Sequence, residues 1–138
     1  EKLKKFGRVG ENRIKAISQA TATQIVTDAS IKIQSYPGDI GFRIAQSINA
    51  RKHDNGLTWF VSVNEVPMAA YIEFGTGTFV EVPPGWEETA WQFYVNGKGY
   101  LRPFPYLYPA YYKARRQYKK DLQESLLYLT NAFNRNTL

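Results

Sequence analysis

The sequence contains no cysteine and a single histidine. The absence of cysteine excludes disulfides and thiolate metal sites. The one histidine, His53, stands just before Asn55-Gly56 in a predicted turn, which is a poor place for a positioned catalytic base. There is no Gly-x-Ser-x-Gly elbow, and no carboxylate has a His or Cys companion at ligand spacing. We therefore predict no enzymatic activity, no cofactor and no metal; a Mg²⁺ site built from carboxylates alone stays open, without a motif that points to it.

Long apolar runs and evenly spread charge are also missing. No stretch of about 18 apolar residues occurs, so the sequence predicts no membrane span. From His53 to Gly97 there are six acidic residues and no Lys or Arg, whereas the flanks carry all 18 basic residues. This asymmetry predicts two electrically different surfaces. They are either ordinary solvated faces, or faces for head-to-tail contact between copies or for nucleic acid.

The first half of the chain reads as a long helix followed by a hairpin. Residues 1–9 are basic and are predicted to be a flexible segment. Apolar residues then recur at three- and four-residue steps, which predicts a helix over 10–35. Residues 42–51 read as a first strand and 57–63 as a second, joined at Asn55-Gly56, a strong hairpin signal.

The second half is organised around a short corner at 67–77. Pro67 can open a helix, and Gly75 can end it in the left-handed conformation. A last helix over 109–131 follows, with an apolar stripe made of Tyr111, Ala114, Tyr118, Leu122, Leu126, Leu129 and Phe133. The predicted fold is a single α+β domain over 1–138, with long N- and C-terminal helices packed on a small antiparallel sheet.

Residues 78–100 are rich in aromatic, acidic, Pro and Gly residues, which predicts a projecting hairpin or loop. Within it, short strands are expected at 78–82 and 86–95. Projecting arms of this kind commonly contact neighbours in assemblies, although simple surface loops are more frequent. The candidate contacts with another copy or a partner are Phe79, Trp86, Trp91, Phe93 and Tyr94.

A basic cluster crowds the first half of the last helix. It consists of Lys113, Arg115, Arg116, Lys119 and Lys120. Lys and Arg on a helix surface can neutralise phosphates, and nearby tyrosines could stack on bases. Tyr111 and Tyr118, however, fall on the predicted apolar stripe and are better explained as core. A nucleic-acid-binding module that uses this helix is therefore the alternative to a structural role.

The corner and the segment after the arm together resemble a known family. The motif Ala69-Ala70-Tyr71-Ile72-Glu73-Phe74-Gly75-Thr76-Gly77, followed by Arg102-Pro103-Phe104 and Tyr108-Pro109-Ala110, is similar to the tailed-bacteriophage tail-component family. The resemblance covers roughly 10–130 and includes the long first helix and the Pro-containing turn after it. The family usually continues Pro-Phe-Leu, whereas Pro105 and Tyr106 intervene here.

The resemblance implies a structural virion protein of the phage neck, which completes the tail or joins head to tail. Such a protein is expected to form a ring, usually hexameric, around the DNA channel. Its expected partners are further copies, the connector or head-closure proteins, the tail terminator or tail tube, and genomic DNA without sequence specificity. It would be assembled in the host cytoplasm and reside at the head–tail junction of the virion.

The motif residues that the resemblance singles out are Tyr71, Glu73, Phe74, Gly75, Thr76, Gly77, Arg102, Pro103, Phe104 and Pro109. Two of them suggest a further hypothesis. A charge pair between Glu73 and Arg102 would tie the corner to the extended segment. If the pair is partly buried, removing one partner would leave an unpaired charge and lower the stability of the fold. The alternative is two exposed, unrelated charges.

Overall fold

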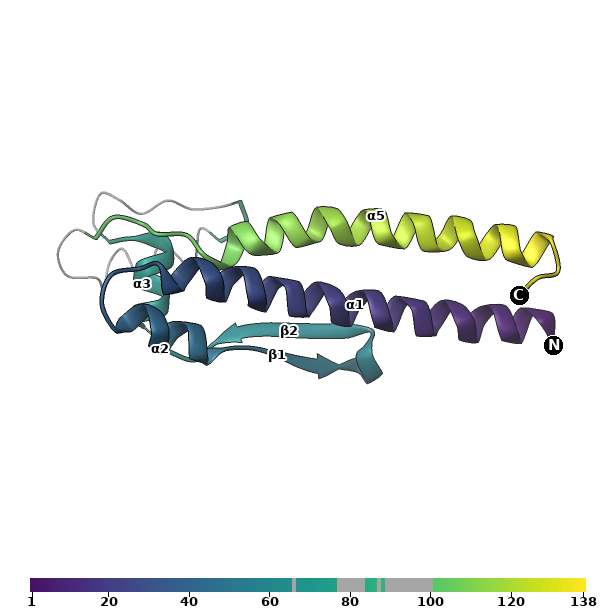
Figure 1. Ribbon diagram of the computed structural model, residues 1–138, viewed down its shortest axis with the longest axis horizontal. Coiled ribbons are helices and arrows are strands. Elements are labelled where there is room, and N and C mark those ends of the chain that lie inside the picture. The colour runs from purple at the N-terminus through teal and green to yellow at the C-terminus, as the bar shows by residue number, and fades with distance from the viewer. Residues whose placement is uncertain (66, 77–83, 87, 89–100) are drawn as a thin grey trace.

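The computed structural model describes residues 1–65, 67–76, 84–86, 88 and 101–138, and these form an elongated α+β arrangement (Figure 1). Two long helices, α1 (Lys2–Gln34) and α5 (Leu107–Asn134), lie side by side and antiparallel along most of the molecule. At 1.5 Å per residue, α1 is about 50 Å long. The two chain termini lie together at one end, and the shorter elements gather toward the other.

A two-stranded antiparallel sheet lies against α1, on the side away from α5 (Figure 1). Strand β1 (Ile48–His53) pairs with β2 (Thr58–Val63) in a register that sets Ile48 opposite Val63. The predicted hairpin is thus confirmed. Its connection is a short 3₁₀ turn in which Asp54 and Asn55 have φ of 48° and 53°. Asp and Asn tolerate this left-handed conformation better than most residues.

The first predicted strand was wrong over much of its length, because residues 40–47 form a helix, α2 (Ile40–Ser47). Ile40 and Ile44 lie four residues apart, a spacing that places both on one face of a helix. Ile44 is fully buried, and Gly41 lies so close to the end of α1 that a Cβ there would stand 2.5 Å from the Ile33 carbonyl oxygen. The absence of a side chain at Gly41 lets α2 fold back onto α1.

Both long helices extend beyond their predicted limits. Helix α1 begins at Lys2, so residues ahead of Gly10 lie in the helix rather than in a separate flexible segment. Helix α5 continues to Asn134. The predicted α5 stripe was wrong at Tyr111 and Leu126, which are exposed by 43% and 62%. The buried side of α5 carries mainly small residues, Ala110, Ala114, Ser125 and Ala132, together with Leu129.

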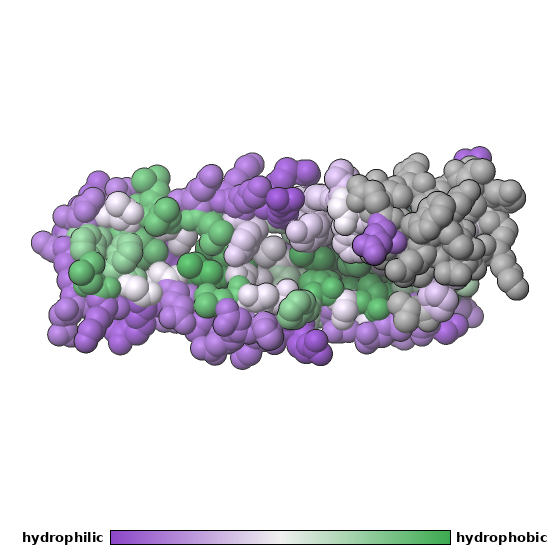
Figure 2. All heavy atoms as spheres, turned by 180° about the vertical axis from the view of Figure 1, so that it is seen from behind, coloured by the Kyte–Doolittle hydropathy of each residue, from purple (hydrophilic) through white to green (hydrophobic). Residues whose placement is uncertain are grey.

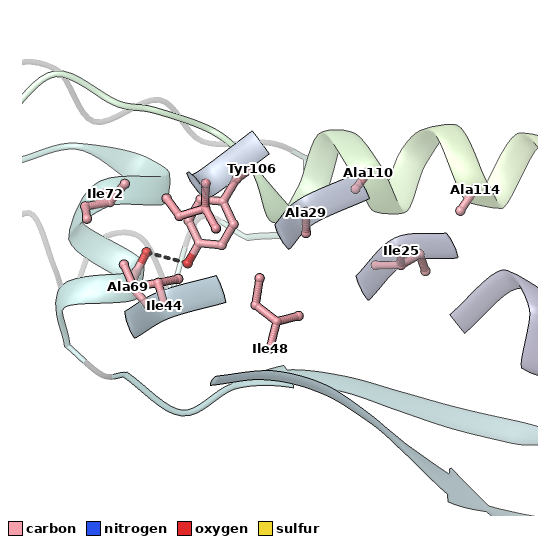
Figure 3. Close-up of a cluster of buried hydrophobic side chains, with 10 residues drawn as sticks. Ile25, Ala29, Ile44, Ile48, Ala69, Ile72, Tyr106, Ala110 and Ala114 are labelled. Carbon is pink, nitrogen blue, oxygen red and sulfur yellow. Dashed lines mark hydrogen bonds between the residues drawn. The ribbon is translucent and has the colours of Figure 1, made fainter. Parts of the chain in front are cut away.

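The hydrophobic core lies where α1, α2, β1, α3 (Met68–Phe74) and the start of α5 meet (Figure 3). Ile33, Ile44 and Ile72 are its largest fully buried side chains. Its members are Ile25, Ala29, Ile33, Ile44, Ile48, Ala69, Ile72, Tyr106, Ala110 and Ala114. The predicted fold class is confirmed, while the arm expected at 78–100 falls almost wholly outside the described residues.

Candidate functional site

Residues 69–76 and residues 101–109 meet between α3 and α5, and we call this region the joint. Pro67 precedes the first residue of α3, and Gly75 ends the helix with φ of 75°, as the sequence predicted. A positive φ of this size is easy for glycine and costly for most other residues. The backbone turns sharply there and brings Thr76 to the extended segment that leads into α5.

The Glu73 carboxylate caps the N-terminus of α5. Its Oε2 accepts hydrogen bonds from the backbone N–H groups of Tyr106 and Leu107, both at 2.9 Å, and its Oε1 accepts one from Tyr108 at 3.0 Å. The first N–H groups of a helix have no partner within the helix, and they form the positive end of its dipole. A carboxylate from α3, more than 30 residues earlier in the chain, thus supplies what a local capping residue usually provides.

Pro109 fits this cap because it lies in the first turn of α5 and has no N–H group. Proline is common in the first helical turn for that reason. It leaves fewer donors at the helix start for Glu73 to satisfy. The predicted place of Pro109 in the first turn is confirmed.

Burial raises the pKa of Glu73, whose side chain is almost fully enclosed. The three backbone N–H groups lower the pKa and offset part of this effect. Burial also raises the pKa of the Tyr106 phenol, and the nearby Glu73 charge raises it further. The Tyr106 hydroxyl remains protonated and donates to the Ala69 carbonyl oxygen at 3.0 Å (Figure 3).

Backbone hydrogen bonds join the rest of the motif to the segment before α5. Thr76 and Leu101 are linked twice: the Thr76 N–H donates to the Leu101 carbonyl at 2.9 Å, and the Leu101 N–H donates to Thr76 Oγ1 at 2.8 Å. The Phe104 N–H donates to the Ile72 carbonyl at 2.7 Å. The two parts of the motif, separated in sequence by the arm, therefore meet in one joint.

The proposed pair between Glu73 and Arg102 is not what holds the joint. The partners that the structure gives for the Glu73 carboxylate are backbone N–H groups, whereas Arg102 lies at the exposed surface. The high cost of desolvating a carboxylate is met here by backbone donors and the helix dipole, which need no second charge.

The remaining motif residues surround the joint. Phe74 is buried, with its ring centroid 6.0 Å from that of Trp86, while Tyr71 and Pro103 are half-buried. Phe104 packs edge-on against Tyr36 at 5.2 Å, and the Lys32 ammonium lies 4.8 Å from its ring. Gly77 lies outside the described residues.

Sequence reasoning missed Tyr106, which is buried and central to the joint. Its signal was the position of Tyr106 directly after Arg102-Pro103-Phe104-Pro105, where two prolines favour extended backbone, and just before the predicted last helix. An aromatic residue at that point can enter the core while its hydroxyl reaches a backbone carbonyl.

An apolar cavity of about 420 Å³ opens beside the joint. Strand β2 contributes Trp59, Val61 and Val63, and the first turns of α5 contribute Tyr108 and Tyr111. Glu73 reaches the wall, but its oxygen atoms already accept hydrogen bonds. The described part of the cavity wall therefore offers mainly hydrophobic surface.

The structure describes all the predicted DNA contacts but only one of the predicted partner contacts. Trp86 is 37% exposed, while Phe79, Trp91, Phe93 and Tyr94 lie outside the described residues. The five predicted cations on α5 are all exposed, in two rows. Lys113, Arg116 and Lys120 form one row at steps of three and four, and Arg115 and Lys119 form the other. Lys113 also lies 4.0 Å from Asp28 of α1.

Within the described part of the chain, no group of three or more His, Asp or Glu side chains is placed to hold a metal ion. The helices described there include none with the length and hydrophobicity needed to cross a membrane. Comparisons of the chain with protein-family models, with curated proteins and with solved structures found no match.

Proposed function

We propose that this chain is a structural virion protein of the tailed-phage neck, which completes the tail or joins head to tail. The observation that supports this best is the joint itself. Its polar groups, Glu73 and Thr76, are engaged with the backbone of residues 101–108. A motif used in this way holds two segments in a fixed relation, as an assembly component needs, and it leaves no carboxylate oxygen free for catalysis.

A ring between the connector and the tail tube would suit the distribution of charge. A ring of identical copies requires heterologous contacts, in which one patch meets a different patch. Helix α1 begins with the cations Lys2, Lys4, Lys5 and Arg8 at one end of the molecule. Glu65, which belongs to the acidic stretch from His53 to Gly97, forms an ion pair of 3.0 Å with Arg43 of α2. The acidic stretch from His53 to Gly97 between basic flanks favours head-to-tail contact between copies, and a hexamer is the expected form.

The first test is antibody labelling of purified particles, imaged by electron microscopy. Label confined to the head–tail junction would support the neck assignment. Label spread along the tail or capsid, or particles that lack the protein, would overturn it. Deleting residues 80–95 then tests the arm: the variant should still fold but should fail to join heads to tails, and efficient joining would refute the role of the arm.

The alternative function is non-specific nucleic-acid binding through α5. It is favoured by one observation, that all five predicted cations are exposed. Binding to phosphates releases counterions, so its affinity should fall steeply between about 50 and 200 mM salt. Ring contacts dominated by aromatic side chains should change little over the same range. In a neck ring these cations would face DNA that passes through the channel without sequence-specific contact.

A further inference from the structure

The apolar stripe of α5 is wider than the surface that α1 covers. Leu129 and Ala114 are buried against α1, whereas Tyr111 and Leu126 are exposed by 43% and 62%. A helix in a monomeric globular protein normally turns its apolar stripe toward the core and its polar residues outward. The uncovered edge of the stripe is therefore a surface left for a partner.

One side of the α1–α5 pair carries partly exposed apolar residues of both helices around the buried Ser18. Ser18 of α1 and Tyr118 of α5 meet across this side, with their oxygen atoms 3.4 Å apart. Ile14 lies one turn before Ser18 and is 38% exposed, and Leu122 and Leu126 lie one and two turns after Tyr118. Residues four apart share a face of a helix, so Ile14 and Leu126 border the same groove.

The same groove continues into the cavity beside the joint, where Ile25 and Tyr111 face Trp59 of β2. Figure 2 shows hydrophobic surface that runs along the long axis of this face, between two hydrophilic margins. We name it the α1–α5 groove, and its residues are Ile14, Ser18, Ile25, Tyr111, Tyr118, Leu122 and Leu126. From Ile14 to Ile25 it extends for about 16 Å, the length of about three helical turns.

The α5 margin of the groove is positively charged. Arg115 and Lys119 follow Tyr111 at steps of four residues, are exposed, and form no ion pair with any residue that the structure describes. The α1 margin carries Glu11 and Lys15, which neutralise each other in an ion pair of 2.7 Å. An occupant with acidic residues along one flank would match this arrangement.

We propose that the α1–α5 groove binds an amphipathic helix of another protein, about three turns long, whose apolar face fills the groove and whose acidic flank meets Arg115 and Lys119. Helix-in-groove recognition uses anchors at i, i+3, i+4 and i+7, which this length accommodates. The surface calls for the same partner chemistry whether or not the chain belongs to a phage neck.

Charge disfavours a second copy in the same groove. Two copies placed groove to groove would bring together two margins that both carry Arg115 and Lys119. The two long helices carry one exposed acidic residue each, Glu11 and Glu124, so neither presents an acidic flank to a second copy. The acidic residues that the structure describes between His53 and Glu88 offer none either, because none lies exposed on a helix of three turns.

The test uses a designed helical peptide of about 11 residues, or three turns, with leucines at the anchor spacing and glutamates on one flank. The control peptide carries lysines in place of the glutamates. Fluorescence anisotropy should show saturable binding of the Glu peptide to the full chain and binding of the Lys peptide that is at least about tenfold weaker. Equal affinity for the two peptides, or no binding of the Glu peptide, would overturn the proposal.

Leu126→Glu and Leu127→Glu form a matched pair of variants. Both leucines are similarly exposed, at 62% and 64%, but Leu127 points about 100° away around α5 and lies outside the groove. Leu126→Glu should weaken binding of the Glu peptide about tenfold or more, because a buried leucine typically contributes that much, whereas Leu127→Glu should not. Equal losses in both would overturn the groove as the binding site, provided that far-UV circular dichroism shows both folded.

Arg115→Glu combined with Lys119→Glu should weaken binding of the Glu peptide and favour the Lys peptide. Three further outcomes would each overturn the proposal in favour of another occupant. A dimer detected by sedimentation and abolished by Leu126→Glu would indicate a second copy. Displacement of the bound peptide by duplex DNA would indicate nucleic acid, and displacement by anionic lipid vesicles would indicate a membrane surface.

Discussion

Replacing Glu73 with alanine should destabilise the fold more than any single surface charge removal. The change leaves the N–H groups of Tyr106, Leu107 and Tyr108 without their acceptor, in a place where Glu73 itself is only 5% exposed. At about 1 kcal/mol for each buried donor left unpaired, the expected loss is about 3 kcal/mol of unfolding free energy. That is a large part of the total stability of a small domain.

Glu73→Gln should cost less, about 1 kcal/mol. The amide keeps one carbonyl oxygen, which can accept two of the three hydrogen bonds, but it turns an NH₂ group toward the third donor. The order expected is therefore wild type, then the glutamine variant, then the alanine variant. This order separates loss of the acceptor from loss of the charge.

Urea unfolding at pH 7, followed by tryptophan fluorescence and circular dichroism, measures these differences. Glu65→Gln is the control, because it removes the same charge from a pair with Arg43 that lies 3.0 Å apart at the surface. An exposed pair of this kind contributes about 1 kcal/mol or less. If Glu73→Ala cost no more than Glu65→Gln, the Glu73 cap would not hold α3 to α5, and the reasoning would be refuted.

Three further predictions concern the same core. Because burial raises the Glu73 pKa above its ordinary value of 4.5, the folded state holds this proton to higher pH than the unfolded state does. Wild type should therefore lose stability as pH rises through the interval between the two pKa values, and a pH series of urea melts on Glu73→Gln should lack this slope. Tyr106→Phe removes the donor to the Ala69 carbonyl and should cost about 1 kcal/mol by the same assay; no change would exclude that hydrogen bond. Gly41→Ala places a Cβ against the Ile33 carbonyl oxygen and should lower the thermal midpoint by an amount equivalent to about 1–3 kcal/mol, whereas an unchanged midpoint would argue against the tight α1–α2 contact.

The fold class, the hairpin and the corner could be predicted from the sequence because their signals are local. Asn55-Gly56 marks a turn by its backbone preference, and Pro67 with Gly75 marks the limits of a short helix. Residues 42–47 were misread because short apolar runs fit a strand and a helix almost equally well. The decisive factor was the contact of Gly41 with α1, which is tertiary and cannot be seen in a sequence window.

Part of the joint was also predictable, though the partner of Glu73 was not. A carboxylate beside a motif with a distant arginine suggests an ion pair, since opposite charges are the partners that a sequence displays. Every residue except proline has a backbone N–H group, so the sequence does not show which of these groups will bind Glu73. A capping carboxylate more than 30 residues away in the chain therefore cannot be recognised from a local motif. Pro109 was the available indication, because it predicted where α5 would begin and hence where unpaired donors would gather.

The error in the α5 stripe carries information of its own. The apolar periodicity of a helix reflects every residue that is buried in the functional assembly, whereas the structure of one chain shows only the burial within that chain. Ala114 and Leu129 belong to the periodic stripe and are buried in the structure, whereas Tyr111 and Leu126 belong to the stripe but are exposed. Their periodic spacing, beside a margin that carries Arg115 and Lys119, is what a second interface would leave in a sequence. The difference between the predicted and observed faces of α5 therefore locates the surface where a partner is to be sought.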